Sequence, residues 1–217
     1  MVNYVIIPAH NEEKTIKETI DEAKKHTPNV VVVNDGSTDK TTEICQHENI
    51  TLISHKINLG KGAALKTGCD YVLTRGAKNI VVIDADGQHD PDLIPVFFKG
   101  LEDIEIVFSH REKPKNMPIV LKFGNMFINK LLTLLYGIEI KDSQCGYRAF
   151  TADAYKKVRW NANDYFMETE MIINAGKAKL KYTQIPIKTV YNDRFKGTTV
   201  KDGVSIVMKL ISSRFFK

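Results

Sequence analysis

The chain has 217 residues, of which 43% are hydrophobic, so it can bury one sizeable core but is too short for a second full domain. Its 31 lysines and arginines against 26 acidic residues give a net charge of +5, which suits an anionic partner but does not by itself indicate nucleic acid. Three widely separated cysteines without a Cys-x-x-Cys pair argue against a disulfide framework or a zinc site and favour a reducing cytosol.

The first 110 residues alternate short apolar runs with amphipathic stretches. This pattern is typical of β-α units around a parallel sheet that is covered on both faces. The expected strands, rich in Val and Ile, are Tyr4–Ile7, Val30–Asn34, Thr51–Ser54, Ile80–Ile83 and Glu105–Ser109. The expected helices between them lie near Glu13–His26, Thr38–His47 and Gly62–Thr74. The first half is therefore predicted to be a doubly wound α/β structure.

The second half has a different pattern, with a loop expected at residues 113–118. Ile119–Tyr136 reads as a helix with an unusually wide apolar face, and short strands are expected at Arg148–Phe150 and Ile185–Tyr191. A second apolar stripe with nearby cations begins at Val204 and continues to the C-terminus. Such amphipathic helices suit a membrane interface, although a helix buried in the core is also apolar nearly all round.

The sequence contains no apolar run of the roughly 18 residues that a spanning helix needs, and its N-terminus does not have the pattern of a signal peptide. We therefore expect a cytoplasmic protein that is peripheral at the membrane if it meets one.

Polar turns follow three of the expected strands, at Pro8–Glu12, Asp35–Asp39 and Asp84–His89. In open parallel sheets, ligands bind at the carboxyl ends of the strands. Three such turns at one sheet edge predict one shared site.

The most informative turn contains Asp84 and Asp86, which follow the short apolar strand Asn79–Ile83. Carboxylates two residues apart in an extended chain point the same way, so both can coordinate one Mg²⁺ or Mn²⁺, with the Gln88 oxygen as a possible third ligand. Such an ion bridges the phosphates of a nucleotide diphosphate. The alternative is that Asp84 caps the next helix and Asp86 is an ordinary turn residue.

The other two turns also have both functional and structural interpretations. Asp35 offers a carboxylate to a base or ribose, and the hydroxyls after it equally suit a helix cap. Asn11 and Glu12 are candidates for base and ribose contacts, but they also suit a plain helix N-terminus.

Two glycine-containing basic segments are candidates for binding phosphate. Asn58–Ala64 indicates an anion-binding turn at a helix start, although it is not a Walker A sequence and a structural turn remains a rival interpretation. Arg194–Thr199, with Lys201 nearby, either clamps phosphates or is a solvated basic loop. Asp142 is either a general base or orienting residue, or merely the start of a turn.

In this order, the motifs resemble glycosyltransferase family 2, which has the GT-A fold. The matching segments are Pro8–Glu12, Asp35–Asp39, Asn58–Ala64, Asp84–His89, Asp142–Arg148 and Arg194-x-x-Gly197. Within that family the chain looks most like the dolichyl-phosphate and polyprenyl-phosphate sugar synthases, where a run of the type Asp-Ala-Asp-x-Gln-His and a later Gly-Tyr-Arg are usual.

The resemblance implies a single GT-A domain, Rossmann-like, with a mostly parallel central sheet, to which the sequence pattern adds C-terminal amphipathic helices. Residues 1–110 would bind the nucleotide-sugar and residues 111–217 the acceptor. It implies donor contacts from Pro8, Ala9, His10, Asn11, Glu12, Val33, Asp35, Lys61, Asp84, Ala85, Asp86, Gln88, Arg194 and Lys201. Metal ligation falls to Asp84, Asp86 and Gln88, and the lipid phosphate to Arg111, Lys122 and Asn125.

The implied reaction is an inverting, single-displacement transfer in which Asp86, Asp142 and Arg194 are the catalytic candidates. A polyprenyl or dolichyl phosphate acceptor is already ionised and needs no base. A sugar hydroxyl needs one, and Asp142 is then the candidate. Two other classes stay open at this point, a sugar nucleotidyltransferase and a non-catalytic nucleotide-binding module.

Overall fold

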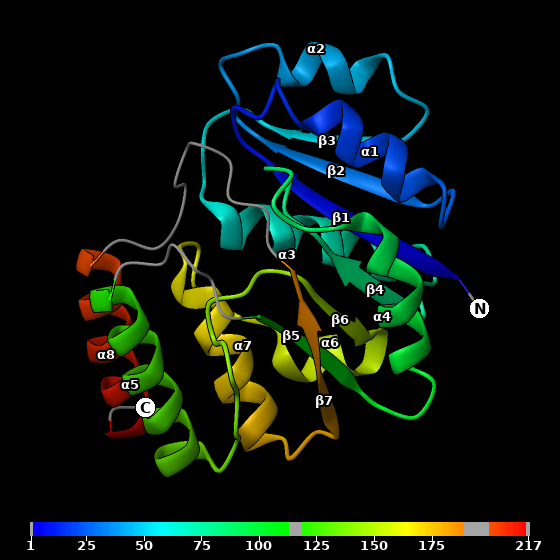
Figure 1. The fold of residues 1–217 in the computed structure, drawn as a ribbon. Helices are drawn as coiled ribbons and strands as arrows, with labels where there is room; N and C mark the ends of the chain where they lie inside the picture. The colour runs from blue at the N-terminus through cyan, green and yellow to red at the C-terminus, as the bar shows by residue number, and fades with distance from the viewer. Residues whose placement is uncertain (1, 113–118, 189–199, 216–217) are drawn as a thin grey trace.

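The computed structural model describes residues 2–112, 119–188 and 200–215, which form one seven-stranded sheet with helices on both faces (Figure 1). The strands lie in the order β3-β2-β1-β4-β6-β5-β7, and all pairs are parallel except those of β6. The strands are β1 Asn3–Ala9, β2 Val30–Asp35, β3 Thr51–His55, β4 Asn79–Val82, β5 Ile106–Arg111, β6 Arg148–Thr151 and β7 Tyr182–Ile187. The predicted mostly parallel α/β sheet is confirmed.

The helices of the first half are α1 Ile16–Lys24, α2 Thr41–Gln46, α3 Lys61–Thr74 and α4 Ile94–Gly100, which a 3₁₀ turn at Pro91–Leu93 precedes. Those of the second half are α5 Ile119–Tyr136, α6 Ala152–Val158, α7 Phe166–Lys177 and α8 Val200–Phe215. Helices α4, α6 and α7 were not predicted from the sequence. Short helices such as α6 depend on tertiary packing and on caps, here the Thr151 hydroxyl accepting from the Ala154 amide at 3.1 Å.

Two cores lie on the two faces of the sheet. In β2, Val31 and Val33 face the core with α3, α6 and α7, whereas Val30 and Val32 face the core with α1 and α4. Both faces of the central strands are therefore buried, which explains why these strands read as unbroken apolar runs.

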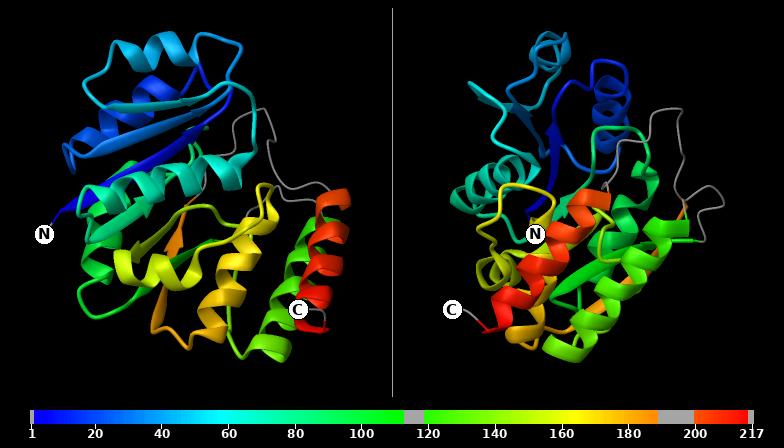
Figure 2. Two further views of the ribbon diagram at one scale, coloured as in Figure 1. Left: turned by 180° about the vertical axis from the view of Figure 1, so that it is seen from behind. Right: turned by 90° about the vertical axis from the view of Figure 1, so that its left-hand side faces the viewer.

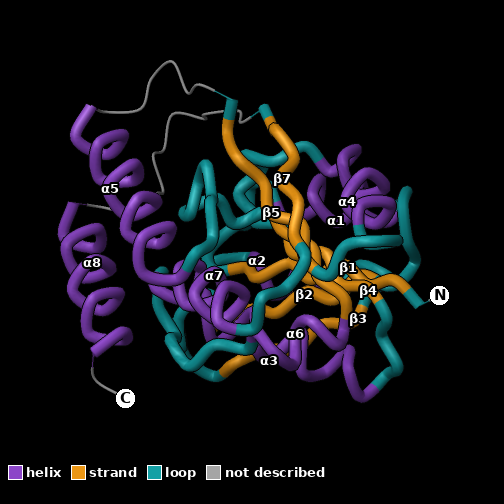
Figure 3. Tube along the Cα trace, turned by 90° about the horizontal axis from the view of Figure 1, so that it is seen from below, coloured by secondary structure: helices purple, strands orange, loops and turns teal. Residues whose placement is uncertain are grey.

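Helices α5 and α8 pack against each other and against α7, outside the sheet layers (Figures 2 and 3). Ile206 and Leu210 of α8 are buried, while Val204 and Met208 on the same helix are exposed. The helix therefore has apolar residues on its inner and outer faces. Within the described ranges, no helix is both long enough and apolar enough to cross a bilayer.

Gly68 allows α3 to pack closely on the sheet. A Cβ at this position would lie 2.6 Å from Ile6 Cγ2 and 3.0 Å from Val33 Cγ2. We expect Gly68→Ala to lower the free energy of unfolding by about 1–3 kcal/mol, because the added methyl forces fully buried side chains apart. Urea unfolding monitored by circular dichroism measures the change.

Gly124 in α5 is the matched control, because among the described residues no atom outside its own stretch of helix lies within 4 Å of its added Cβ. Gly124→Ala should stabilise the protein by up to about 1 kcal/mol through helix propensity. Equal stability changes for the two variants would contradict the packing argument.

Candidate functional site

A cavity of about 600 Å³ opens at the carboxyl ends of the strands. The turns after β1, β2 and β4 contribute to it, together with the start of α3 and the loop before α7. Its lining residues are Pro8, Ala9, His10, Asn11, Glu12, Asp35, Asn58, Gly60, Lys61, Ala64, Asp84, Ala85, Asp86, Asp164 and Tyr165. The structure thus brings the three polar turns together at one site.

The turn after β1 is bonded to the turn after β2. Asn11 has a left-handed backbone with φ of 57°, and its amide oxygen accepts from the Thr38 backbone amide at 2.8 Å. The Asn11 backbone amide donates to the Ser37 hydroxyl at 3.0 Å, so Ser37 holds this turn instead of capping α2. The His10 ring nitrogen Nδ1 contacts the Asp35 carbonyl at 2.8 Å. These contacts fix the walls of the cavity before any ligand binds.

Asp35 braces the cavity wall through its carboxylate. Its side chain accepts hydrogen bonds from the backbone amides of Leu59 at 2.9 Å and Gly60 at 2.8 Å, and it contacts His55 Nδ1 at 2.7 Å. Asp35 is therefore as much a support for the turn before α3 as a candidate ligand for a ribose.

Val33 does not reach the cavity. Its side chain is fully buried in the core beneath α3, and it is absent from the lining residues. The Val33 side chain therefore offers a ligand no surface, and the contact that the resemblance implied would have to come from its backbone. Its alternation with Val32 fixes the side chain on the core face of β2.

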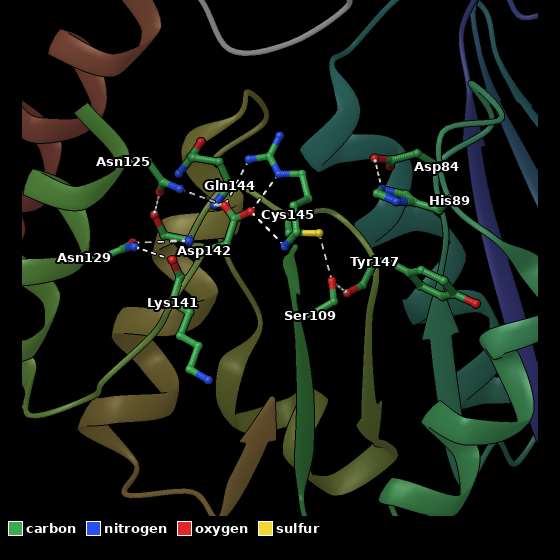
Figure 4. Close-up of polar contacts among 12 residues, drawn as sticks. Asp84, His89, Ser109, Asn125, Asn129, Lys141, Asp142, Gln144, Cys145 and Tyr147 are labelled. Carbon is green, nitrogen blue, oxygen red and sulfur yellow. Dashed lines mark hydrogen bonds and ion pairs between the residues drawn. The ribbon is translucent and has the colours of Figure 1, made fainter. Parts of the chain in front are cut away.

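Asp84 is engaged by a lysine in this structure. Lys61 Nζ lies 2.8 Å from Asp84 Oδ1 and 2.9 Å from Glu168 Oε1, so one ammonium is shared by two carboxylates. His89 Nε2 lies 3.6 Å from Asp84 Oδ2 (Figure 4). Burial opposes the charge of Asp84, but Lys61 and His89 outweigh it and hold the pKa of Asp84 below its ordinary value. The helix-cap alternative is wrong for Asp84, since Asp90 caps the next helical turn.

Asp86 is the carboxylate that best fits a cation. Burial and then the neighbouring charge of Asp84 raise its pKa, which is the condition that a divalent ion relieves. Its Oδ1 accepts from the backbone amide of Gln88 at 3.0 Å, as in an ordinary Asp turn, and Gln88 is not among the lining residues. In the part of the chain that the structure describes, no group of three His, Cys, Asp or Glu side chains is poised for a metal. Asp84 and Asp86 are the residues that would hold a hard cation here, and its remaining ligands would have to come from a bound molecule.

A second cluster gathers around Asp142, which is buried (Figure 4). Arg111 donates from Nε to Oδ2 at 2.6 Å and from Nη2 to Oδ1 at 3.0 Å, and Asn125 donates its amide to Oδ1 at 3.0 Å. Two of the three predicted acceptor residues therefore meet at one carboxylate. The Lys122 and Lys201 side chains and the whole of Arg194 lie outside the described residues.

The environment of Asp142 makes it a weak base. Burial raises its pKa, but hydrogen bonds and charge from Arg111, followed by the Asn125 amide, outweigh burial and lower the pKa overall. This favours orientation of Arg111 and Asn125 as the role of Asp142, ahead of proton abstraction.

One turn connects the Asp142 cluster to the cavity. Arg148 is fully buried and donates to the carbonyls of Ser143, Cys145 and Glu168, which shapes the turn between them. Gly146 in this turn lies against the lysine–carboxylate pair, because a Cβ there would be 2.5 Å from Asp84 Oδ2 and 2.7 Å from Lys61 Nζ. The turn therefore touches the first site with Gly146 and the second with Asp142.

Three residues at the cavity or at its lysine were not predicted from the sequence: Asp164, Tyr165 and Glu168. The only sequence signal for a role of Glu168 was a charged residue among the apolar residues of α7. That signal does not identify the partner, because Lys61 lies 107 positions away in the sequence.

Comparison with known proteins gives a consistent result. A family model described as glycosyl transferase family 2 matches residues 4–159. The UDP-N-acetylglucosamine–dolichyl-phosphate N-acetylglucosaminyltransferase of Methanococcus voltae is 34% identical over 242 residues, with 99% of this chain and 96% of that protein covered. A dolichyl-phosphate beta-glucosyltransferase of Trichomonas vaginalis is 31% identical over 211 residues, or 85% of this chain and 64% of that protein.

Among solved structures, the glucosyl-3-phosphoglycerate synthase of Mycobacterium tuberculosis with Mn²⁺, uridine diphosphate and phosphoglyceric acid has a TM-score of 0.76. The match covers 98% of this chain and 78% of that one at 19% identity, so it shows the fold alone. The expected GT-A fold is confirmed.

The Asp142 cluster predicts a pH-dependent stability. Because the pKa of Asp142 is lowered in the folded protein, its contribution is complete above the ordinary carboxyl pKa of about 4 and is lost as the pH falls through the lower, folded-state pKa. We expect Asp142→Asn to cost about 2–3 kcal/mol of unfolding free energy at neutral pH, since it leaves Arg111 without its carboxylate. The difference from wild type should shrink in urea titrations at progressively lower pH.

Asp153→Asn is the control, because the Asp153 side chain is 83% exposed and should change stability by no more than about 0.5 kcal/mol. A constant difference between Asp142→Asn and wild type at all acidic pH values would contradict the assigned pKa direction.

Proposed function

The chain belongs to glycosyl transferase family 2, and from that premise we propose that it transfers a hexose from a nucleotide-sugar to a polyprenyl or dolichyl phosphate at the cytoplasmic face of a membrane. Relatives named for transfer to dolichyl phosphate support the acceptor, and the name of the Methanococcus voltae enzyme supports a UDP-sugar among the GDP-mannose and UDP-glucose types of donor. Family membership decides against a nucleotidyltransferase and against a module without activity.

The proposal depends on one observation, the turn from Asp142 to Gly146. At one end Gly146 contacts the Asp84–Lys61 pair, and at the other Asp142 holds Arg111 and Asn125. Four residue steps span at most about 14 Å of extended chain. A donor diphosphate at the first cluster and an acceptor phosphate at the second would therefore be close enough to share one sugar.

The carboxylates and the lysine have separate proposed roles at the donor. Asp86, with Asp84, would hold Mg²⁺ or Mn²⁺, which when bound neutralises charge on the diphosphate leaving group. Lys61 would add a further cation beside that diphosphate. The turns after β1 and β2 would enclose the base and ribose, with Asn11 and Asp35 already held in place by the protein.

The acceptor chemistry agrees with the character of Asp142. A lipid phosphate oxygen is ionised at neutral pH and attacks the anomeric carbon directly with inversion, so positioning suffices and no base is required. Transfer to a sugar hydroxyl of a glycan would require a base, and the lowered pKa of Asp142 disfavours it for that task. Arg111 and Asn125, oriented by Asp142, would instead place the phosphate oxygen for attack.

The outer surface of α5 and α8 supports a membrane location. Phe127 and Leu134 of α5 are 51% and 79% exposed, and Val204 and Met208 of α8 are 61% and 66% exposed. The two helices pack side by side, and Figure 3 shows them together at the edge of the molecule. Large apolar side chains on neighbouring helices, on a chain of net positive charge, suit an anionic lipid surface.

Product formation tests the transfer. The protein is incubated with Mn²⁺, a panel of UDP- and GDP-sugars and polyprenyl phosphate, and both nucleoside diphosphate release and glycolipid are measured. Asp86→Asn should lower kcat by about 10³-fold or more with the fold intact, because charge stabilisation of the leaving group is lost. Asp153→Asn should behave as wild type. If no donor–acceptor pair gives nucleoside diphosphate release, the proposed activity is wrong. If the only product is a glycosylated sugar hydroxyl, the proposed lipid phosphate acceptor is wrong.

Flotation with vesicles of neutral and anionic phospholipid tests the membrane surface. We expect the wild-type protein to float with anionic vesicles, and Leu134→Ser with Met208→Ser to lower its partition coefficient roughly a hundredfold or more, since each withdrawn side chain contributes about 1.5 kcal/mol or more. Val96→Ser on α4, where the side chain is 45% exposed, is the control and should float normally. A wild-type protein that stays at the bottom of every gradient would contradict the membrane location.

A further inference from the structure

Lys61 is shared by two carboxylates whose surroundings differ. The Glu168 side chain is only 4% exposed, whereas the Asp84 side chain is 20% exposed and lines the cavity. The Lys61 side chain itself is 21% exposed. The ammonium therefore lies at the boundary between the cavity and the protein interior.

Glu168 depends on Lys61 more than Asp84 does. A carboxylate that is almost fully buried is very unfavourable without a cation. Lys61 is the cation that forms an ion pair with the Glu168 carboxylate, while Arg148 adds positive charge from farther away. Asp84 has a second neighbour in His89 and faces a cavity large enough for a ligand. Breaking the Lys61–Asp84 ion pair therefore costs less free energy than breaking the Lys61–Glu168 ion pair.

A divalent cation bound through Asp84 would compete with Lys61 for the same carboxylate. An ammonium 2.8 Å from Oδ1 already neutralises Asp84, and a second cation beside it would be repelled. Gly146 closes one side of the pair without room for a Cβ, so the ammonium has little free space there. Because Glu168 also contacts Lys61, the ammonium would still be paired with one carboxylate if Asp84 bound the divalent cation instead.

We infer that Glu168 is a positioning residue of the donor site: it retains the Lys61 ammonium when Asp84 passes to a divalent cation, so that this cation binds well only together with a nucleotide diphosphate. The diphosphate supplies the negative charge that makes two neighbouring cations tolerable. This inference deepens the proposed function and rests on it for the identity of the nucleotide. Arg148 supports the arrangement by binding the Glu168 carbonyl at 2.8 Å, which fixes the start of α7.

Metal binding without nucleotide or catalysis tests the inference. Free Mn²⁺ is measured by electron paramagnetic resonance during titration of the full-length protein, first alone and then with UDP or GDP. The wild-type protein should bind Mn²⁺ alone weakly. The double variant Lys61→Met with Glu168→Gln replaces the buried ion pair by neutral side chains of similar size, and it should bind Mn²⁺ alone at least tenfold more tightly because Asp84 is released.

The single variants separate the two roles. Glu168→Gln leaves Lys61 with Asp84 as its only carboxylate partner among those described here, so Mn²⁺ in the presence of UDP should bind about tenfold more weakly than to wild type. Lys61→Met should resemble the double variant in binding Mn²⁺ alone, because Glu168 acts through the lysine. The matched control is Lys66→Met, which removes a lysine from the same helix as Lys61→Met at a position that does not line the cavity.

Equal affinity of wild type and both Lys61→Met variants for Mn²⁺ alone would overturn the inference, and so would a wild-type protein that binds Mn²⁺ as tightly without nucleotide as with it. If the circular dichroism spectrum shows that the double variant has lost helix, the inference is decided by Mn²⁺ binding to Lys61→Met and by wild type with and without nucleotide. Failure of the proposed function is distinguishable: it appears as absence of glycolipid product or of UDP and GDP binding, whereas the comparison with Mn²⁺ alone requires neither.

Discussion

The ammonium of Lys61 joins the two halves of the molecule at the site. Lys61 is the first residue of α3, in the first half. Its ammonium pairs there with Asp84, just after β4, and also with Glu168 of α7 in the second half. The three side chains have little exposure, so removal of the lysine would leave two carboxylates at the cavity and in the interior without their shared cation. This requirement fixes how α7 approaches the sheet edge. It also explains the glycines at the contact: a Cβ on Gly146 would collide with the pair, and one on Gly62 would lie 2.4 Å from the Ala162 carbonyl.

The sequence predicted the first half of the fold and site well because both depend on local patterns. Central strands buried on both faces must be apolar throughout, and the residues that follow them must be polar to end the strand at a solvated edge. Val30–Asp35 shows both features within six residues. The shared position of the three turns then follows from parallel topology alone. The same logic located Asp86 at the cavity. Lys61 was predicted at an anion-binding helix start and, through the resemblance, at the donor, with no indication that it would bind Asp84.

The features that the sequence did not reveal depend on long-range contacts. Glu168 reaches Lys61 across 107 residues. The antiparallel insertion of β6 between β4 and β5 has no local signal, because a strand of four residues, three of them buried, suits either direction. Val33 was assigned to the ligand through the resemblance, yet the alternation of side chains along β2 directs it into the core. The role of a buried polar residue such as Arg148 is difficult to predict from sequence. The sequence does not distinguish a buried arginine that shapes a turn from an exposed arginine that binds phosphate.

The two clusters share a design that bears on how a negatively charged substrate enters. Each consists of a cation already held by protein carboxylates: Lys61 by Asp84 and Glu168, and Arg111 by Asp142. Before a ligand arrives, such pairs keep both side chains ordered and avoid an isolated buried charge. A phosphate then has to compete with a carboxylate, which weakens binding but rejects anions that cannot also satisfy the neighbouring groups. On the proposed function, selectivity for a diphosphate at one cluster and a lipid phosphate at the other follows from partner exchange between charges that the fold has already positioned.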